Sequence, residues 1–215
     1  MRAVNFGCGL SVAPDWLNYD ASPTLRLQRL PLIGQVVGRL IAPRFPLLAH
    51  YGDVVRGLPL ADGSADLVYC SHVLEHLALQ DCRGALAEVA RVLKPGAVFR
   101  GVIPALETEV RGYINDAADD ACSRFMQRTY LGAAHRHRGV MGLLRGSLGN
   151  SQHLWMWDFK GLQAELRAAG FVDIRRAAYG DSRYPQFRSV EDPLRWQGAL
   201  GFECIAMRYA DGPCS

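Results

Sequence analysis

The chain has 215 residues, of which 49% are hydrophobic, and it carries 24 Lys and Arg residues against 21 Asp and Glu residues. This length suits one α/β domain with a continuous core. The net charge of +3 is small, and nearly all the positive charge is arginine, since Lys94 and Lys160 are the only lysines. Composition therefore gives no reason to expect a nucleic-acid partner.

The six cysteines form no CxxC pair, and Cys8 and Cys70 lie within strand-like segments. They indicate free thiols in a reducing compartment. The first residues enter a predicted strand without the charged and apolar leader of a signal peptide, and the apolar stretch Leu30 to Ala42 is too short to span a bilayer. We therefore expect a cytoplasmic protein without a transmembrane segment.

The first two predicted strands are Ala3 to Phe6, closed by Gly7-Cys8-Gly9, and Trp16 to Asp20, which ends on a carboxylate. Only Leu10 to Asp15 separates them. Because a parallel crossover normally contains a helix, the first helix is expected to be reduced to a turn or absent, unless the two strands are not parallel neighbours.

Strands alternate with helices along the rest of the chain, as in an α/β sheet protein. We expect Asp81 to be a helix N-cap, with Leu86, Val89, Ala90 and Leu93 as the buried stripe and Pro95-Gly96 as the stop signal. The further predicted strands are Leu47–Tyr51, Asp66–Cys70, Ala97–Ile103, Val172–Ala178 and Cys204–Tyr209, and Phe159 to Ala169 is a predicted helix with Asp158 as its N-cap.

Two segments exceed a minimal fold, residues 22–50 and residues 105–153. The first has four arginines and no acid. Leu30 to Ala42 within it indicates a surface helix over the sheet or, alternatively, a lid or an interfacial contact with an acidic or lipid-linked substrate. Loops this long are usually functional or disordered. We expect one domain over residues 1–215, in which both insertions form a cap on the substrate side.

Five short segments occur in a fixed order: Ala3 to Gly9, Trp16-Leu-Asn-Tyr-Asp20, Gly52-Asp53, Leu58 to Leu77, and Arg91-Val-Leu-Lys-Pro-Gly96. This order resembles the class I S-adenosylmethionine-dependent methyltransferases, especially the small-molecule, type 11-like branch. The resemblance implies a doubly wound, Rossmann-like α/β sheet of seven strands in the order 3-2-1-4-5-7-6, with the last strand antiparallel.

The resemblance also implies S-adenosylmethionine as cofactor. The implied binding residues are Phe6, Gly7, Cys8 and Gly9 at the glycine turn, Asp20 on the ribose diol, Asp53 and Val54 beside adenine, and Ser71 and His72 after the fourth strand. A glycine turn lets backbone N–H groups approach a ligand closely. Gly7-x-Gly9 lacks the third glycine of the dinucleotide fingerprint, which disfavours a nicotinamide or flavin site.

The segment Ser71 to His76 allows a second interpretation. His72, Glu75 and His76 have the H-x-x-E-H spacing of inverted zinc peptidases, in which both imidazoles lie on one helix face. A zinc site would need a third ligand from downstream, such as Glu107 or Glu109. The position before Arg91-Val-Leu-Lys-Pro-Gly96 favours the transferase, and we predict no metal site.

For methyl transfer, the candidate general bases are His76 and His153. The stretch His135-Arg-His-Arg138 reads as a solvated face or as an anion-binding patch. Bacterial relatives with Trp-x-Asn-x-Asp early and His-x-Trp-Met-x-Asp late in the chain are associated with sugar or polysaccharide assembly. This association suggests that the acceptor is a hydroxyl or amine of a sugar, a glycan or another small molecule. A third hypothesis is a non-catalytic cofactor-binding domain that partners another enzyme. The sequence does not define the oligomeric state.

Overall fold

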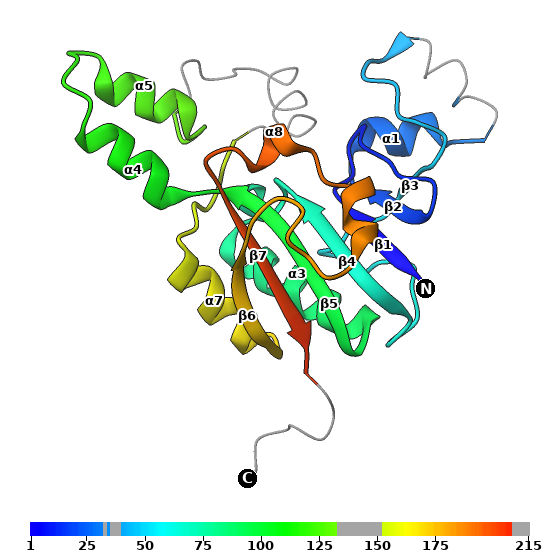
Figure 1. Ribbon diagram of the computed structural model, residues 1–215. Helices are drawn as coiled ribbons and strands as arrows, with labels where there is room; N and C mark the ends of the chain where they lie inside the picture. The colour runs from blue at the N-terminus through cyan, green and yellow to red at the C-terminus, as the bar shows by residue number, and fades with distance from the viewer. Residues whose placement is uncertain (32–33, 35–39, 133–151, 208–215) are drawn as a thin grey trace.

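A computed structural model describes residues 1–31, 34, 40–132 and 152–207 of the chain. Its centre is one seven-stranded sheet (Figure 1) with the order β3-β2-β1-β4-β5-β7-β6, as predicted. The strands are β1 Ala3–Phe6, β2 Trp16–Asp20, β3 Ala49–Tyr51, β4 Ala65–Ser71, β5 Leu93–Pro104, β6 Phe171–Ala177 and β7 Ala199–Ala206.

The first two strands are parallel neighbours, with Ala3 opposite Trp16 and Phe6 opposite Tyr19. No helix is present between them in this fully described stretch, so the predicted loss of the first helix is confirmed. β7 runs antiparallel to both β5 and β6, which confirms the predicted direction of the last strand.

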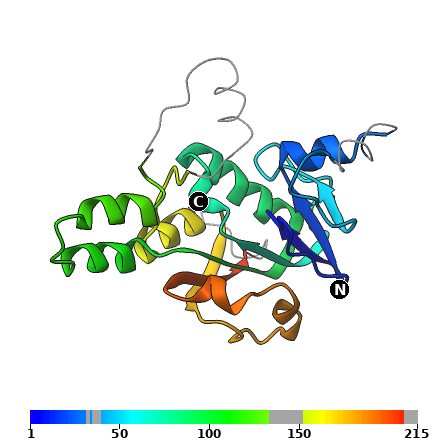
Figure 2. The ribbon, with the colours of Figure 1, turned by 90° about the horizontal axis from the view of Figure 1, so that it is seen from above.

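The two faces of the sheet are covered unequally (Figure 2). The helices α3 Leu79–Val92 and α7 Phe159–Ala168 pack on one face, where the larger apolar core lies. The other face is covered by the short helices η2 Pro185–Ser189 and α8 Pro193–Trp196, through Phe187 and Trp196. The sheet therefore has a thick helical layer on one face and a thin one on the other.

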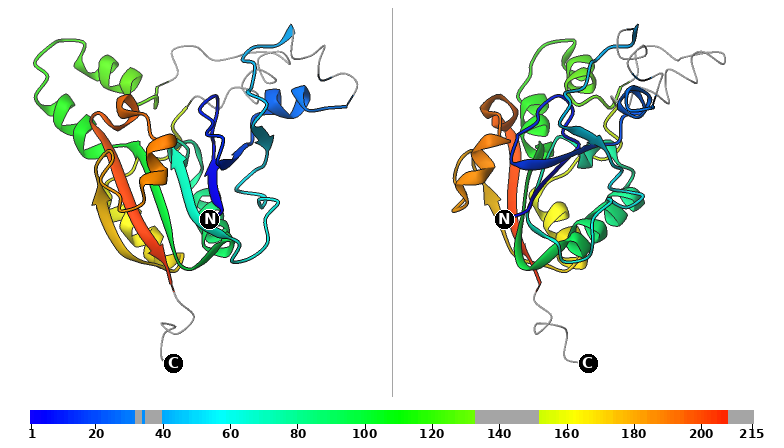
Figure 3. Two further views of the ribbon diagram at one scale, coloured as in Figure 1. Left: turned by 45° about the vertical axis from the view of Figure 1, so that its right-hand side comes forward. Right: turned by 90° about the vertical axis from the view of Figure 1, so that its right-hand side faces the viewer.

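The carboxyl ends of β1 to β4 meet at one edge of the sheet, which is the usual ligand-binding edge of such folds. At this edge, α1 Pro23–Gln28 stands on one side, while α4 Leu106–Ile114 and α5 Ala121–Arg128 form a hairpin on the other (Figures 1 and 3). The helix α1 belongs to the predicted insertion 22–50, and the α4–α5 hairpin belongs to the predicted insertion 105–153. Residues 32–33, 35–39 and 133–151, and with them most of the Leu30 to Ala42 stretch and all of His135 to Arg138, lie outside the described residues.

Some predicted boundaries were wrong. The helix α3 begins two residues before Asp81, with Ala78 as its N-cap, so Asp81 lies in the first turn, where its charge still suits the helix dipole. The helix ends at Val92, so Pro95-Gly96 lies just beyond its end as predicted, in the irregular start of β5. Asp158 is an N-cap as predicted, because its Oδ1 accepts a 2.7 Å hydrogen bond from the Gly161 N–H.

β7 begins at Ala199, five residues before its predicted start. The added part contains Gly201, where a Cβ would lie 2.2 Å from the Trp196 ring. The glycine thus permits close packing of α8 on the strand. Within the described residues, no helix is both long and apolar enough to cross a membrane.

Candidate active site

The glycine turn after β1 is held directly against the segment that follows β4. Gly7 has a φ of +63°, and a Cβ at this position would lie 2.2 Å from Cγ2 of Val73. Gly9 also has a positive φ, of +54°, but nothing lies within 4 Å of its missing Cβ. Gly7 is therefore required both by its positive φ and by the close approach of Val73, whereas Gly9 is required by its positive φ alone.

Asp20, at the tip of β2, organises this turn. Its Oδ2 accepts a 2.9 Å hydrogen bond from the Gly9 N–H, and its Oδ1 accepts a 2.8 Å bond from the Ser22 N–H. A carboxylate oxygen has two lone pairs, so these bonds leave acceptor capacity on both oxygens. The side chain can therefore hold the loop and accept hydrogen bonds from a diol at the same time.

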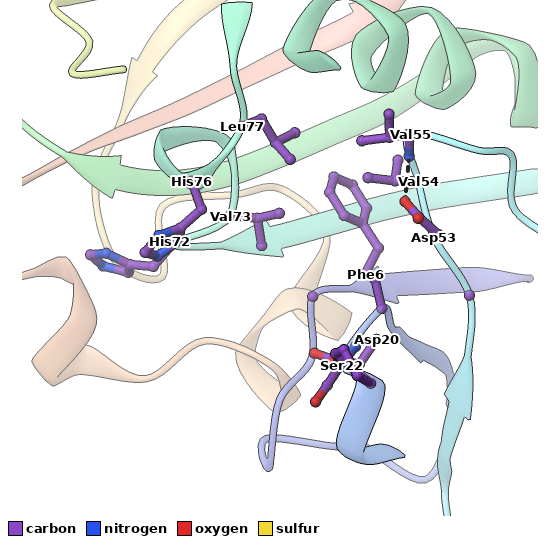
Figure 4. Close-up of a pocket in the computed structure, with 14 residues that line it drawn as sticks. Phe6, Asp20, Ser22, Asp53, Val54, Val55, His72, Val73, His76 and Leu77 are labelled. Atoms are coloured by element: carbon purple, nitrogen blue, oxygen red, sulfur yellow. Dashed lines mark hydrogen bonds between the residues drawn. The ribbon is translucent and has the colours of Figure 1, made fainter. Parts of the chain in front are cut away.

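Asp53 follows β3 and is also engaged locally. Its Oδ1 accepts a 3.0 Å hydrogen bond from the Val55 N–H, and its Oδ2 lies 3.4 Å from Nε of Arg56. Val54 beside it is 7% exposed. The pair supplies an acceptor next to an apolar surface at the same edge as Asp20 (Figure 4).

These residues line one pocket of about 310 Å³, here called the donor pocket. Six of the nine predicted cofactor residues line it, namely Phe6, Gly7, Asp20, Asp53, Val54 and His72. Sequence reasoning did not name its remaining lining residues, Ala21, Ser22, Pro23, Gly52, Val55, Val73, His76 and Leu77, as cofactor residues. Most of these are apolar neighbours of residues that were named, and only their position beside the motifs could have indicated them.

The other three predicted cofactor residues lie elsewhere. Cys8 and Ser71 line a cavity of about 20 Å³ on the other side of the glycine turn, and Gly9 lines neither space. Burial, and secondarily the charge of Asp20, raises the pKa of Cys8 to about 12. Cys8 is therefore a neutral thiol at physiological pH and supports the turn by packing.

A second pocket, of about 530 Å³ and here called the acceptor pocket, adjoins the donor pocket. His72 and His76 line both pockets, so they form the border between them. The other residues of the acceptor pocket are Glu75, Tyr130, His153, Leu194, Arg195 and Gln197. Both predicted bases, His76 and His153, therefore face one space.

Backbone hydrogen bonds bring His153 to this place from far along the chain. The N–H groups of Leu154 and Trp155 donate to the carbonyl oxygen of Glu75 at 2.7 and 3.1 Å. The ring centroids of His76 and His153 are 4.9 Å apart in an edge-on arrangement, and the Tyr130 ring lies 5.1 Å from that of His153. This part of the site thus depends on contacts between segments that are distant in sequence.

The H-x-x-E-H segment does not form the helical pair that a zinc peptidase requires. His72 directly follows β4 and has a φ of +54°, and only Leu74–His76 form a short 3₁₀ helix. Glu107 and Glu109, the third ligands considered above, do not line this pocket. The helical premise of the peptidase interpretation was wrong.

The His72 ring lies between two oxygen atoms. Its Nε2 lies 3.1 Å from the carbonyl oxygen of Arg195, and its Nδ1 lies 3.1 Å from Oε1 of Glu75. Burial alone would lower the pKa of His72, but the contacts with Glu75 and with the Arg195 carbonyl outweigh it and raise the pKa. The buried Glu75 side chain thus favours the protonated form of the His72 ring.

Two residues of the acceptor pocket have strained backbones. His72 and Tyr130 have φ values of +54° and +52°, and Asp173 is the one other non-glycine residue in the described part of the chain with a positive φ. Such strain persists only where surrounding contacts impose it, and it is frequent at functional sites.

Comparisons with known proteins agree with this geometry. Residues 35–100, under a third of the chain, match a family model described as a methyltransferase domain. Among solved structures, a chain from a complex that contains the Haloferax volcanii Trm112 methyltransferase activator aligns with 96% of this chain and 83% of its own length, at 18% identity and a TM-score of 0.51. At this identity the likeness shows the fold alone.

Two further structures have lower scores. The YcgJ protein from Bacillus subtilis aligns at 17% identity and a TM-score of 0.49, covering 96% of this chain and 92% of its own. The S-adenosylmethionine-dependent methyltransferase SibL in its apo form aligns at 16% identity and a TM-score of 0.48, covering 96% and 50%. Among curated proteins, no sequence matches the chain.

The match and the sheet order confirm the predicted class. The sheet has the Rossmann-like methyltransferase fold, and residues 35–100 match a methyltransferase domain. The protein is therefore an enzyme, and its cofactor is S-adenosylmethionine. The hypothesis of a non-catalytic domain is set aside.

Proposed function

We propose that the enzyme transfers the methyl group of S-adenosylmethionine to a hydroxyl or amine of a small polar acceptor, with a carbohydrate as the favoured class, in the cytoplasm. The observation that carries the proposal is that the donor and acceptor pockets share His72 and His76 as a common border. A cofactor in the first pocket and an acceptor in the second would meet there.

The donor pocket offers the groups that the cofactor needs. In the proposed pose, Asp20 accepts hydrogen bonds from the ribose diol, Asp53 and Val54 border the adenine, and Gly7 allows close backbone approach. The cofactor's sulfur then faces the histidine border. The carboxylates are complementary to donor groups of the ligand, and the apolar lining suits the adenine ring.

Methyl transfer breaks the bond between carbon and sulfur and forms a bond between carbon and the acceptor oxygen or nitrogen, while the acceptor loses a proton. The leaving thioether is neutral, so alignment supplies much of the rate, up to about 7–11 kcal/mol of the barrier. A positioned base adds about 10²–10⁴-fold. His76 and His153 are the proposed groups that act on the acceptor proton.

Exposed aromatic side chains favour a ring-shaped polar acceptor. Tyr130 in the acceptor pocket is 55% exposed, and Trp155, two residues after His153 in the chain, is 41% exposed. Large exposed aromatic rings provide apolar faces for stacking and polar tips for hydrogen bonds. Both residues come from the 105–153 insertion or directly follow it, in keeping with a cap on the substrate side.

The test measures release of S-adenosylhomocysteine from the purified enzyme with panels of nucleotide-linked sugars, amino sugars and other small hydroxyl compounds. With an accepted compound, Tyr130→Ala should raise KM or lower kcat while cofactor affinity stays within about threefold, because only acceptor contacts are lost. Tyr179→Ala is the matched control, since Tyr179 is 48% exposed and lines neither pocket. Equal effects of both changes would argue against this acceptor pocket.

A further inference from the structure

The acceptor pocket contains a buried carboxylate without hydrogen-bond donors. Glu75 is 0% exposed, and within the described residues neither of its carboxylate oxygens has a hydrogen-bond partner. Nδ1 of His72 lies 3.1 Å from Oε1 of Glu75, but this contact is not an aligned hydrogen bond. Buried charges in proteins are normally paired and hydrogen-bonded or bound to a metal.

Two imidazoles stand beside this carboxylate. One ligand atom from each of Glu75, His76 and His153 can be chosen so that all lie within 4.8 Å of one another. His153 is 9% exposed, and its Nδ1 is also buried without a hydrogen-bond partner in the described part of the chain. The side chains of Glu75, His76 and His153 thus lie close together, and Glu75 and His153 have buried polar atoms without a hydrogen-bond partner among the described residues.

We propose that Glu75, His76 and His153 bind a divalent transition-metal ion, such as Zn²⁺ or Mn²⁺, at the edge of the acceptor pocket. Two imidazoles and one carboxylate are a donor set that such ions accept. Ligand atoms around one ion lie roughly 3–4 Å apart, because each sits about 2.0–2.2 Å from it. Their present spacing of up to 4.8 Å is somewhat wider than this range, so the side chains would close in on a bound ion.

The surroundings match those of a metal site. Nδ1 of His76 lies 3.0 Å from the carbonyl oxygen of Gln152, and metal-binding histidines commonly use one ring nitrogen for such a backbone contact. His72 is a positioning residue, since it lies against Glu75 with one ring nitrogen and against the Arg195 carbonyl with the other. The backbone bonds from Leu154 and Trp155 to Glu75 hold the two ligand segments together.

The ion would leave coordination positions open toward the acceptor pocket, because the protein supplies three ligands. An acceptor hydroxyl bound there would lose its proton to solvent more easily, as water does on catalytic zinc. This catalytic consequence rests on the proposed function. In such a mechanism, His76 and His153 would hold the ion and would not take the acceptor's proton themselves. The metal site itself does not depend on it.

The test uses the full chain without a histidine tag, freed of metal by dialysis against a chelator. Titration with Zn²⁺ and Mn²⁺ should show one ion bound per chain, and Co²⁺ should give a visible absorption spectrum of a site with nitrogen and oxygen ligands. Glu75→Gln and His153→Ala should each weaken binding by at least about tenfold. His50→Ala is the control, since His50 is an exposed histidine on β3, and it should bind as the parent does.

The outcomes separate the two proposals. If Glu75→Gln does not fold, the metal affinities of His153→Ala and His153→Asn are compared with that of the parent instead. Absence of stoichiometric binding, or binding that survives the changes at Glu75 and His153, would overturn the metal site. Metal binding without any methyl transfer would leave the site standing and count against the proposed function, whereas full activity in metal-free enzyme would remove the catalytic role of the ion.

Discussion

The backbone N–H of Gly9 donates a 2.9 Å hydrogen bond to Oδ2 of Asp20, so the acid at the end of β2 holds the glycine turn at the end of β1. The missing first helix makes this bond important, because the connection between the two strands is otherwise a short loop. The same carboxylate would also receive the cofactor's ribose. Structure and binding are thus coupled at Asp20.

This coupling predicts the effect of Asp20→Ala. Hydrogen bonds to a charged group contribute about 1.5–3 kcal/mol, so the dissociation constant for S-adenosylhomocysteine should rise by about 10–150-fold. Calorimetric titration measures it. Asp15→Ala, which removes an exposed acid from the preceding loop, should leave the affinity unchanged. Equal affinities for the Asp20 variant and the parent would show that Asp20 only supports the loop.

The two glycines of the turn should differ in their tolerance of a methyl group. Gly7→Ala places a Cβ against Val73 in addition to imposing a positive φ, and should cost about 2–5 kcal/mol of unfolding free energy. Gly9→Ala has only the conformational cost, about 1–2 kcal/mol. Urea unfolding of both variants measures the difference. A loss at Gly9 as large as that at Gly7 would contradict the close packing on Val73.

A buried arginine under the thin layer of the fold should give a pH-dependent stability. The Arg100 side chain is 0% exposed and contacts Glu191 at 2.5 Å, Asp181 at 2.9 Å and Glu203 at 3.1 Å. Burial would raise the pKa of Asp181, but hydrogen bonds from Arg175, the Ala178 N–H and Arg100 lower it to about 2.

Because this pKa is depressed in the folded state, the stabilisation is fully present above about pH 4 and is lost as the pH falls toward 2. Asp181→Asn should therefore lower the stability by about 1 kcal/mol near neutral pH, after allowance for solvent screening of a side chain that is 33% exposed. Thermal unfolding of both proteins from about pH 6 to about pH 3 should show the difference shrinking. A constant difference would exclude this role.

Cofactor binding should stabilise the whole protein. At about 100 times its dissociation constant, S-adenosylhomocysteine adds about 2.7 kcal/mol, which corresponds to a rise in Tm of about 5–11 °C at this chain length. NAD should cause no shift, because the glycine turn lacks the dinucleotide fingerprint. No shift with saturating S-adenosylhomocysteine would argue against the donor pocket.

The sheet could be predicted from the sequence because its signals are local. The short apolar runs that end in Gly7 or on Asp20 identify buried strands, whereas the strand order followed only from the resemblance to the methyltransferases. Helix starts were less certain, since α3 begins at Leu79 without a side-chain cap, and no local signal marks such a start.

The convergence of Glu75, His76 and His153 could not be predicted in the same way. It depends on backbone hydrogen bonds from Leu154 and Trp155 to Glu75, which join segments that are far apart in the chain. The sequence supplied His76 and His153 as separate candidates for a base, but their shared pocket is a property of the folded chain.

The central claim is that methyl transfer takes place where the donor and acceptor pockets meet, at His72 and His76. The most direct test is a crystal structure of the enzyme with S-adenosylhomocysteine. The account predicts the ribose on Asp20, the adenine beside Asp53 and Val54, and the sulfur facing the two histidines. A ligand bound outside this pocket, or with its sulfur directed away from His72 and His76, would contradict it.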